Sequence, residues 1–384
     1  MQKVFVESHN ILSPLGNTTL ENFIQVQNGH SGVKLHHRKD LHDEGIWASI
    51  IGAGQFEEIT KGIINCNNFT RFEKLLIASI NNALITSSVD LSSNETIFIF
   101  STTKGSIELL EKQDASPELY ERMSLHNSCS LVSNYFKNEN KPVIISNACV
   151  SGVTAILYAR RVLASGSFKN AVIVGADTFS KFVFSGFLSF QALSQGRCSP
   201  FSNNRDGINL GEAAATIIIT TQAEYVAQGV KMEVLNGAIS NDSNHISGPS
   251  RTGQELSTAI DKAIQLSGIS AKDIGFISAH GTATLFNDEM EAKAFNLSGL
   301  QNTPVNSLKG YFGHTLGAAG LVESIISILS LKQGIVIPTA GFSELGVSPP
   351  INVCNNKINN TMRYFLKTAS GFGGCNATLV FSKS

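Results

Sequence analysis

The sequence predicts an α/β fold built from two similar halves, and three observations support this prediction. Short apolar segments rich in β-branched residues alternate with longer segments of helical pattern, which is typical of layered strands and helices. A strand–turn–helix–turn–strand unit occurs at residues 142–176 and again at residues 304–339. The 384 residues exceed one small core and suit one large or two fused domains. The repeated unit indicates an internal duplication, with a boundary near residues 221–231.

Strands are predicted where a short apolar run is flanked by glycine, asparagine or other turn residues. These runs are Lys3–Glu7, Thr96–Ser101, Pro142–Ser146, Ala171–Val174, Ala213–Thr220, Met232–Ser240, Gly275–Ser278 and Ala377–Phe381. Helices are predicted for longer segments with helical spacing of apolar residues. These segments are Arg71–Ser87, Ser151–Ala164, Gln254–Leu266, Asp288–Leu297 and Gly317–Leu331. If the halves are equivalent, the turns of the two repeated units face each other across a pseudo-two-fold axis.

Composition and charge exclude several classes of function. Hydrophobic residues make up 42% and charged residues 15%, and 29 basic against 30 acidic side chains leave a formal net charge of −1. This balance gives no overall attraction to nucleic acid or an anionic membrane. The longest apolar runs are strand-sized, so no membrane span is predicted, and the N-terminal residues lack the apolar core of a signal peptide. The six cysteines contain no CxxC pair, so we expect a cytoplasmic protein with reduced thiols and no zinc site.

Cys149 lies in VIISNACVSGVTAILYARR, where an apolar strand gives way to a helix. Amide groups and the dipole at a helix N-terminus favour a thiolate. By itself, a cysteine at such a place is more often an inert core residue than a nucleophile. Its position makes Cys149 the candidate nucleophile of the first half.

His280 ends an apolar strand in ISAHGTATLFNDEMEAKA. Considered alone, it is as readily a packed strand-end histidine as a functional one. Thr282 and Thr284 follow in a small turn, where their hydroxyls can bond an amide-bearing ligand arm. Asp288 and Glu291 are predicted to be structural, as an acid at the helix start and a charge partner.

Lys309 and His314 lie in VNSLKGYFGHTLGAAGLVE, in a glycine-flanked turn between a strand and a helix. Glu323 follows within that helix, where a solvated charge is the commoner case. Phe372 stands between glycines in SGFGGCNATLVF, just before the last predicted strand. A glycine cluster of this kind is usually only a turn or a bulge.

The combination of these turns is more specific than any one of them. A cysteine and two histidines at strand ends supply a nucleophile and two polar groups facing one site. Two neutral imidazoles can donate hydrogen bonds to a thioester oxygen as carbanion character develops. The backbone N–H groups of Cys149 and Phe372 can form an oxyanion hole. These groups suit thioester transfer followed by reaction of a stabilised enolate.

Six ordered motifs span almost the whole chain. They are NACVSG around Cys149, CSPFSNNRDGINLGEAAA at 198–215, NDSNHISGP at 241–249, HGTATLFND at 280–288, NSLKGYFGH at 306–314 with GAAG following, and SGFGGCN at 370–376. In this order they resemble the elongating β-ketoacyl-acyl-carrier-protein synthases, the type II ketosynthases of the thiolase superfamily. The resemblance implies an acyltransferase of fatty-acid or polyketide synthesis.

The resemblance also implies a fold and partners. The thiolase fold is a five-layer α-β-α-β-α sandwich of duplicated halves, here residues 1–225 with the nucleophilic cysteine and residues 226–384 with the two histidines. The implied reaction is a decarboxylative Claisen condensation of a cysteine-bound acyl chain with malonyl-carrier protein, giving a 3-oxoacyl thioester. The implied partners are an acyl carrier protein, whose phosphopantetheine holds the substrates, and a second subunit. With that subunit the chain forms a homodimer, or a heterodimer with a chain-length-factor-like ketosynthase. The resemblance implies no metal and no separate cofactor.

By position, Cys149 matches the acylated nucleophile of the family. His280 and His314 match the pair that assists malonyl decarboxylation and stabilises the enolate. Lys309 matches the lysine that orders the second histidine, and Glu323 matches the buried acid nearby.

The resemblance assigns further residues to substrate contacts. Phe372 matches the gate at the mouth of the acyl tunnel, and Phe187 is expected to line the acyl pocket. Thr282 and Thr284 match the pantetheine contacts. For docking of the acidic carrier we consider Arg71 and Lys74, on a predicted surface helix, where an ordinary solvated face is the commoner case.

Departures from the family pattern keep a narrower assignment and two alternatives open. Cys375 stands where threonine is common, GEAAA occupies residues 211–215, and NDSNHISGP is similar to ketosynthases of aryl-polyene and related pigment clusters. A thiolase-type acetyl-CoA acyltransferase would use a second cysteine as base, in the region of Cys375. A chain-length-factor-like subunit would share the fold but typically lacks the nucleophilic cysteine, which is present here.

Overall fold

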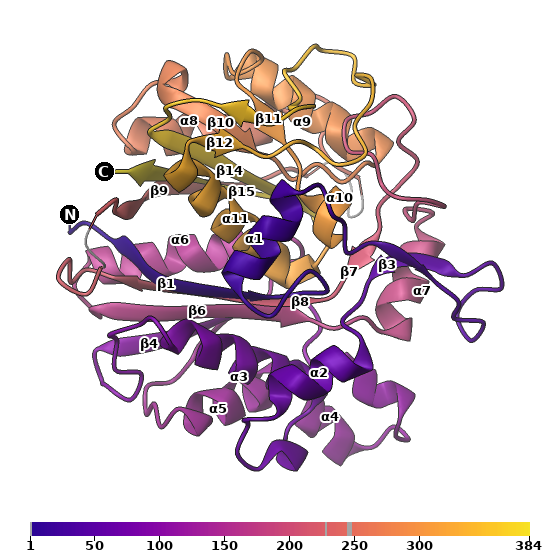
Figure 1. The fold of residues 1–384 in the computed structure, drawn as a ribbon, viewed down its shortest axis with the longest axis vertical. Coiled ribbons are helices and arrows are strands. Elements are labelled where there is room, and N and C mark those ends of the chain that lie inside the picture. The colour runs from indigo at the N-terminus through magenta and orange to yellow at the C-terminus, as the bar shows by residue number, and fades with distance from the viewer. Residues whose placement is uncertain (1, 227–228, 244–247) are drawn as a thin grey trace.

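A computed structural model describes residues 2–226, 229–243 and 248–384. Ten strands in one hydrogen-bonded order form its frame, which divides between β1 and β9 into two five-stranded sheets, one from each half of the chain (Figure 1). From its outer edge inward, the first sheet contains β5 (Val143–Ile145), β4 (Thr96–Ser101), β6 (Asn170–Asp177), β8 (Ala213–Thr220) and β1 (Phe5–Leu12). The second contains β11 (Val305–Asn306), β10 (Ile274–Ser278), β14 (Tyr364–Gly371), β15 (Cys375–Lys383) and β9 (Met232–Asn241). Antiparallel pairing of β1 with β9 joins the two sheets.

The two sheets repeat one topology. In each, the three outer strands are parallel, and two antiparallel strands follow toward the junction. In each, the first strand of the half lies at the junction and the third at the outer edge. The duplication predicted from the repeated strand–helix unit is therefore visible in the strand pairing. The exact boundary at residues 225/226 stays a prediction.

Helices cover both sheets and fill the space between them. The N-terminal sheet packs its outer face on α3 (Arg71–Leu84) and α5 (Leu125–Tyr135). The C-terminal sheet packs its outer face on α8 (Gln254–Leu266) and α9 (Leu285–Leu297). Between the sheets lie α6 (Ser151–Ala164) and α11 (Ala319–Gln333), one from each half. The order of layers is helix, sheet, helix, sheet, helix.

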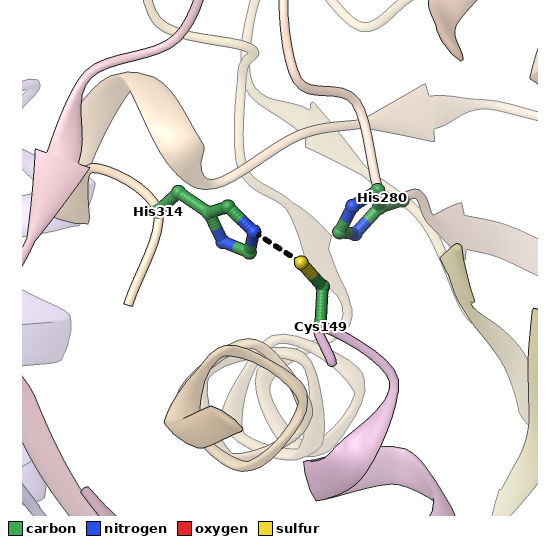
Figure 2. A group of neighbouring side chains, drawn as sticks. All are labelled: Cys149, His280 and His314. Carbon is green, nitrogen blue, oxygen red and sulfur yellow. Dashed lines mark hydrogen bonds between the residues drawn. The ribbon is translucent and has the colours of Figure 1, made fainter. Parts of the chain in front are cut away.

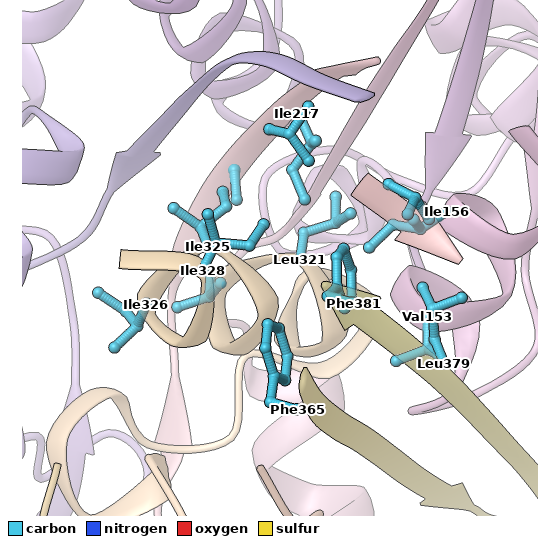
Figure 3. Close-up of a cluster of buried hydrophobic side chains, with 14 of the residues drawn as sticks. Val153, Ile156, Ile217, Leu321, Ile325, Ile326, Ile328, Phe365, Leu379 and Phe381 are labelled. Carbon is cyan, nitrogen blue, oxygen red and sulfur yellow. The ribbon is translucent and has the colours of Figure 1, made fainter. Parts of the chain in front are cut away.

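The two central helices meet closely because glycines lie at their contact. A Cβ atom on Gly152 would lie 2.9 Å from the backbone nitrogen of Leu321, and one on Gly320 would lie 2.5 Å from that of Val153. Apolar side chains of both helices and both sheets surround this contact, as Figure 3 shows. Leu316–Gln333 is long and apolar enough for a membrane span, but 83% of this segment is buried. It is the core helix of this fold.

The predicted elements agree with the structure where the pattern is apolar, and differ where buried polar residues interrupt it. Residues 96–101, 213–220, 151–164 and 254–266 form elements with the predicted bounds. β1 continues five residues past its predicted end, through the polar SHN that sheet pairing buries. The prediction missed β14, an eight-residue strand of the C-terminal sheet.

Smaller elements lie around the frame. The remaining helices are α1 (Thr19–Gln27), α2 (Ala53–Thr60), α4 (Pro117–Met123), α7 (Lys181–Ser189) and α10 (Lys309–Phe312). The remaining strands are β2 (Lys34–His36), β3 (Ile46–Ser49), β7 (Leu210–Gly211), β12 (Ile335–Val336) and β13 (Ile358–Asn359). Short 3-10 turns occupy Cys66–Asn68, Ile107–Glu111, Ala271–Asp273 and Leu316–Ala318.

Candidate active site

Cys149 lies in a strained turn between β5 and α6. Ala148 has a left-handed φ of 43°, which is costly for a residue with a side chain. Ser151 stabilises the turn, since its hydroxyl donates to the carbonyl of Ala148 at 2.6 Å and accepts from the N–H of Asn147 at 2.8 Å. The turn presents Cys149 to a pocket of about 460 Å³.

Both predicted histidines lie beside Cys149 (Figure 2). His314 Nε2 is 2.9 Å from Cys149 Sγ, and the two imidazole rings are nearly perpendicular, with centroids 5.4 Å apart. Cys149 Sγ and one ring nitrogen of each histidine all lie within 4.8 Å of one another. The three turns singled out from the sequence therefore meet at one point, although 165 residues separate Cys149 from His314.

The backbone around His314 is held by the N-terminal half. Its N–H donates to the carbonyl of Asn209 at 2.7 Å, and its carbonyl accepts from the N–H of Gly211 at 2.9 Å. Gly211 is required there, because a Cβ atom would lie 2.1 Å from the carbonyl oxygen of Phe312. The histidine of the second half is thus fixed by contacts with the first.

Burial decides the protonation of the three reactive groups. It raises the pKa of the Cys149 thiol to about 11, against the opposing effect of Lys309. Desolvation therefore outweighs the influence of the helix end, which by itself favours the thiolate. Burial, and then the charge of Lys309, lowers the pKa of both His280 and His314 well below the usual value. Both imidazoles are neutral at physiological pH.

Lys309 contacts His280, not the second histidine as expected. Its ammonium group donates to the carbonyl of His280 at 2.6 Å and lies 3.3 Å from His280 Nδ1. An ammonium group cannot accept a hydrogen bond, so Nδ1 accepts and the ring proton of His280 lies on Nε2. Glu323 is buried and forms an ion pair with Lys309 at 2.6 Å. The ammonium group lies near His280 because β11, which ends three residues before Lys309, pairs with the end of β10.

Two carboxylates hold the turn that follows β10. Glu291 accepts from the N–H groups of His280 and Gly281, and Asp288 accepts from the N–H of Thr282. This geometry agrees with the structural role expected for both acids. The Thr282 and Thr284 hydroxyls bond each other at 2.8 Å, and both residues line the pocket.

Phe372 lies at the tip of the turn between β14 and β15. Its N–H points to Cys149 Sγ and opposes the rise of the thiol pKa. Its ring contacts those of Phe187 and Phe190, with centroid distances of 5.8 and 5.2 Å, and Phe187 also contacts His314. Phe187 and Phe372 therefore line the pocket as expected, and Phe190 is a third aromatic residue there that the sequence did not suggest.

Two buried charges near the site escaped prediction. Lys367, within β14, forms an ion pair with Glu323 at 2.7 Å. Asp177, at the end of β6, accepts from the Thr102 hydroxyl and from the N–H groups of Thr103 and Gly317. The local signal in both cases is a charged residue in an apolar strand, within it for Lys367 and at its end for Asp177.

Two other expectations change with the structure. Arg71 binds Glu212 with two hydrogen bonds of 2.7 and 2.8 Å, so its charge is engaged inside the protein instead of being offered to a carrier. Cys375 accepts a hydrogen bond from Asn241 and is not among the residues that line the pocket. Residues 244–247 of the segment 241–249 lie outside the described residues.

Two family models and several curated relatives match this chain. Residues 4–224 match the family model "Beta-ketoacyl synthase, N-terminal domain", and residues 232–343 match "Beta-ketoacyl synthase, C-terminal domain". Two curated relatives are named 3-oxoacyl-[acyl-carrier-protein] synthase 2. The Mycobacterium leprae protein is 32% identical over 61% of this chain and 59% of its own length. The Vibrio cholerae protein is 33% identical over 63% of this chain and 62% of its own length. The chain thus spans about three fifths of the relatives' length.

Solved structures share the fold. "The ishigamide ketosynthase/chain length factor" superposes with a TM-score of 0.91 at 23% identity, covering 99% of both chains. A β-ketoacyl synthase from Burkholderia phymatum gives a TM-score of 0.86 at 23% identity over the full length of both chains. A ketosynthase, ApeO, solved with its chain length factor ApeC from Xenorhabdus doucetiae gives 0.83 at 24% identity, covering 100% of this chain and 98% of that one. The predicted duplicated, five-layer fold is confirmed.

Proposed function

This chain belongs to the β-ketoacyl synthase family, and from that premise we propose that it is a 3-oxoacyl-carrier-protein synthase. It joins an acyl chain held on Cys149 to a malonyl unit held on an acyl carrier protein, with loss of carbon dioxide. The observation that carries this proposal is the meeting of one buried thiol with two neutral imidazoles and the N–H of Phe372.

In the first stage, Cys149 takes the acyl chain. Its sulfur attacks the carbonyl carbon of the acyl-carrier thioester, the carbon–sulfur bond to the carrier breaks, and the thiol proton ends on the released carrier thiol. The N–H groups of Cys149 and Phe372 hold the tetrahedral oxyanion. His314 Nε2 lies 2.9 Å from Cys149 Sγ, and with the ring proton on this nitrogen it stabilises the attacking thiolate together with the N–H of Phe372, whereas burial alone disfavours the thiolate.

In the second stage, malonyl-carrier enters the same pocket. The bond to the carboxylate breaks, carbon dioxide leaves, and its electron pair forms an enolate on the thioester. The Nε2–H groups of His280 and His314 donate to the enolate oxygen. The enolate carbon attacks the acyl-Cys149 carbonyl and the thiolate departs, leaving a 3-oxoacyl-carrier two carbons longer. The thioesters supply the activation, and the hydroxyls of Thr282 and Thr284 contact the pantetheine arm.

The thiolase alternative is less well supported. It needs a second cysteine as base, and among the described residues that line the pocket only Cys149 is a cysteine. A thiolase would condense acetyl thioesters without releasing carbon dioxide, so comparing malonyl and acetyl donors separates the two activities. The chain-length-factor alternative is disfavoured by the presence of Cys149, His280 and His314 together.

The partners we propose are an acyl carrier protein and a second ketosynthase-like subunit, as a homodimer or a heterodimer. One solved neighbour is a ketosynthase in complex with its chain length factor, and another is a type II carrier protein in complex with its ketosynthase. Free cysteines throughout the described chain suit a cytoplasmic location. An aryl-polyene substrate stays a prediction.

Intact-protein mass spectrometry tests the central proposal. Incubation with an acyl-carrier thioester should add one acyl mass to the wild-type chain and none to Cys149→Ala. Cys198→Ala and Cys66→Ala are the controls and should be acylated normally, because neither residue lines the pocket. Normal acylation of Cys149→Ala would refute the proposal.

A further inference from the structure

Lys367 is a fully buried lysine in the middle of a sheet. It lies on β14 opposite Ser278 of β10, in parallel pairing, two residues before His280. Its ammonium group donates to the carbonyls of Ser278, Ala279 and Thr368 at 3.1, 3.2 and 2.8 Å. Its side chain is 0% exposed. Burying a lysine is costly, and its neighbours Phe365 and Leu366 show that this strand accepts apolar residues.

Glu323 connects Lys367 to His280. One carboxylate oxygen pairs with Lys367 at 2.7 Å and the other with Lys309 at 2.6 Å. Lys309 in turn lies against the carbonyl and Nδ1 of His280. Two ammonium groups therefore share one carboxylate, and together they hold the three consecutive carbonyls of residues 278–280.

The position of Lys309 depends on this sharing. A buried carboxylate with a single ammonium partner would draw it in to satisfy both oxygens. Lys367 lies beside one oxygen as an ion pair and not as a hydrogen-bond donor, so its charge balances that side of the carboxylate. Lys309 then donates only to the other oxygen, and its remaining donors reach His280. This contact puts the ring proton of His280 on Nε2, the nitrogen that the reaction needs as donor.

We propose that Lys367 is a positioning residue for decarboxylation, acting on His280 through Glu323 and Lys309. This inference rests on the proposed function and deepens it. It assigns to the C-terminal half a four-residue relay, Lys367–Glu323–Lys309–His280, that leaves the acylation of Cys149 to other groups.

Replacing the lysine separates this role from simple packing. Lys367→Met keeps the length and unbranched shape of the side chain but leaves Glu323 to Lys309 alone. Release of carbon dioxide should fall on the order of tenfold, no more than the loss expected for removing a histidine donor outright. Acylation of Cys149 should change less than twofold, since it uses His314 and Phe372. Lys367→Arg keeps the charge and should retain most of the release.

The pH profile gives a signature that packing does not. The titratable and charged groups facing His280 are Cys149, Glu291, Lys309, His314, Glu323 and Lys367. Burial lowers the pKa of His280 most, and the charges of Lys309 and Lys367 lower it further, so removing the charge of Lys367 raises it. Release of carbon dioxide needs the neutral imidazole of His280, so the acid limb of its pH profile follows the pKa of His280. In Lys367→Met this limb should move to higher pH by on the order of 0.5 pH unit, and in Lys367→Arg it should stay in place.

The experiment measures carbon dioxide release from malonyl-carrier across pH, and Cys149 acylation by mass, in the full chain. Phe365→Leu is the matched control: it weakens the same strand within the stacked Phe276–Phe365–Phe381 cluster and touches none of the charges. The proposal is supported if Lys367→Met loses about tenfold in carbon dioxide release and the acid limb of its pH profile moves to higher pH, while Phe365→Leu shows neither effect. The proposal is overturned if acylation of Cys149 and release of carbon dioxide fall equally in both variants, or if the acid limb of Lys367→Met does not move.

Nitrogen-15 spectra of the histidine rings test the relay without any activity. The His280 signals are assigned by their loss in His280→Gln. The wild-type ring should carry its proton on Nε2, and Lys367→Met should shift the ring toward a mixture of tautomers. An unchanged tautomer in Lys367→Met overturns the inference. A wild-type chain that neither acylates Cys149 nor releases carbon dioxide would instead refute the proposed function.

Discussion

The two turns that meet at the site come from equivalent places in the two halves but are built differently. In the N-terminal half, β5 ends at Ile145 and α6 begins at Ser151, so the turn is short and Cys149 is presented by a strained backbone. In the C-terminal half, β11 ends at Asn306 and α11 begins at Ala319, and the longer turn contains α10 and a 3-10 turn. The longer turn has room for both Lys309 and His314.

The surroundings of the two turns differ as well. Hydroxyl and backbone groups hold the turn of Cys149, whereas the turn after β11 carries Lys309, whose ammonium group pairs with Glu323 and donates to the carbonyl of His280. The duplicated scaffold therefore supplies two different environments at one point: a strained nucleophile on one side and charge-ordered hydrogen-bond donors on the other. This division predicts that the two half-reactions can be separated by mutation.

The largest expected effect comes from removing the nucleophile alone. Cys149→Gln should lose condensation completely and still release carbon dioxide from malonyl-carrier, because polarising the thioester needs only the histidines. Its amide reaches toward the oxyanion hole and mimics an acylated cysteine. Adding His280→Ala or His314→Ala should lower this release on the order of tenfold or more.

Carbon dioxide release by purified single and double variants checks this prediction. Cys129→Ala, another buried cysteine, is the control and should leave condensation intact, since Cys129 packs in the outer core. If Cys149→Gln releases no carbon dioxide, or if neither histidine change lowers its release, then the two half-reactions are not carried by separate groups of the two halves.

The next effect is the pH dependence of the thiol. The pKa of Cys149 is raised to about 11, so the thiolate is a minor species at neutral pH. The rate of alkylation of Cys149 by iodoacetamide should therefore rise about tenfold per pH unit from pH 7 to 9. Measuring alkylation by mass at each pH checks this. A rate that is level above pH 7 would show that the helix end and His314 hold a thiolate after all.

The sequence identified the reactive side chains better than their environment. Cys149, His280 and His314 were predicted because each lies where an apolar strand meets a turn, a local pattern. Burial is not local, so the helix end at Cys149 suggested a thiolate where desolvation instead raises the pKa. Lys309 lies five residues from His314 in sequence, yet the fold sets its ammonium group against His280.

Charge pairs were the least predictable part of the molecule. Arg71 at a helix start resembled a solvated residue, and its partner Glu212 lies 141 residues away. Lys367 and Glu323 likewise belong to different elements, a strand and a helix. A single sequence does not show which lysine meets which carboxylate, because that depends on tertiary packing.

The contact between the central helices couples the two turns, and enlarging it should disturb both. Gly320→Ala places a Cβ atom 2.5 Å from the backbone nitrogen of Val153, so the helices must move apart. We expect a loss of about 1–3 kcal/mol in the free energy of unfolding, together with slower acylation of Cys149. Urea unfolding and the mass assay measure these. Gly54→Ala in α2 is the control, since its new methyl group meets open space, and it should cost nothing.

The smallest expected effect concerns the carboxylate that joins the halves. Asp177 of β6 accepts from the Gly317 N–H of the C-terminal turn at 2.7 Å and from the N-terminal Thr102 hydroxyl at 2.9 Å. In Asp177→Asn one acceptor oxygen becomes an NH₂ group, so one of these buried donors loses its partner. The free energy of unfolding in urea should fall by about 1–2 kcal/mol. Asp90→Asn is the control and should change it little, because Asp90 is exposed and its carboxylate accepts from nearby Ser92. If both variants lose the same small amount, Asp177 does not hold the halves together, and the glycine contact of α6 with α11 alone aligns the two turns.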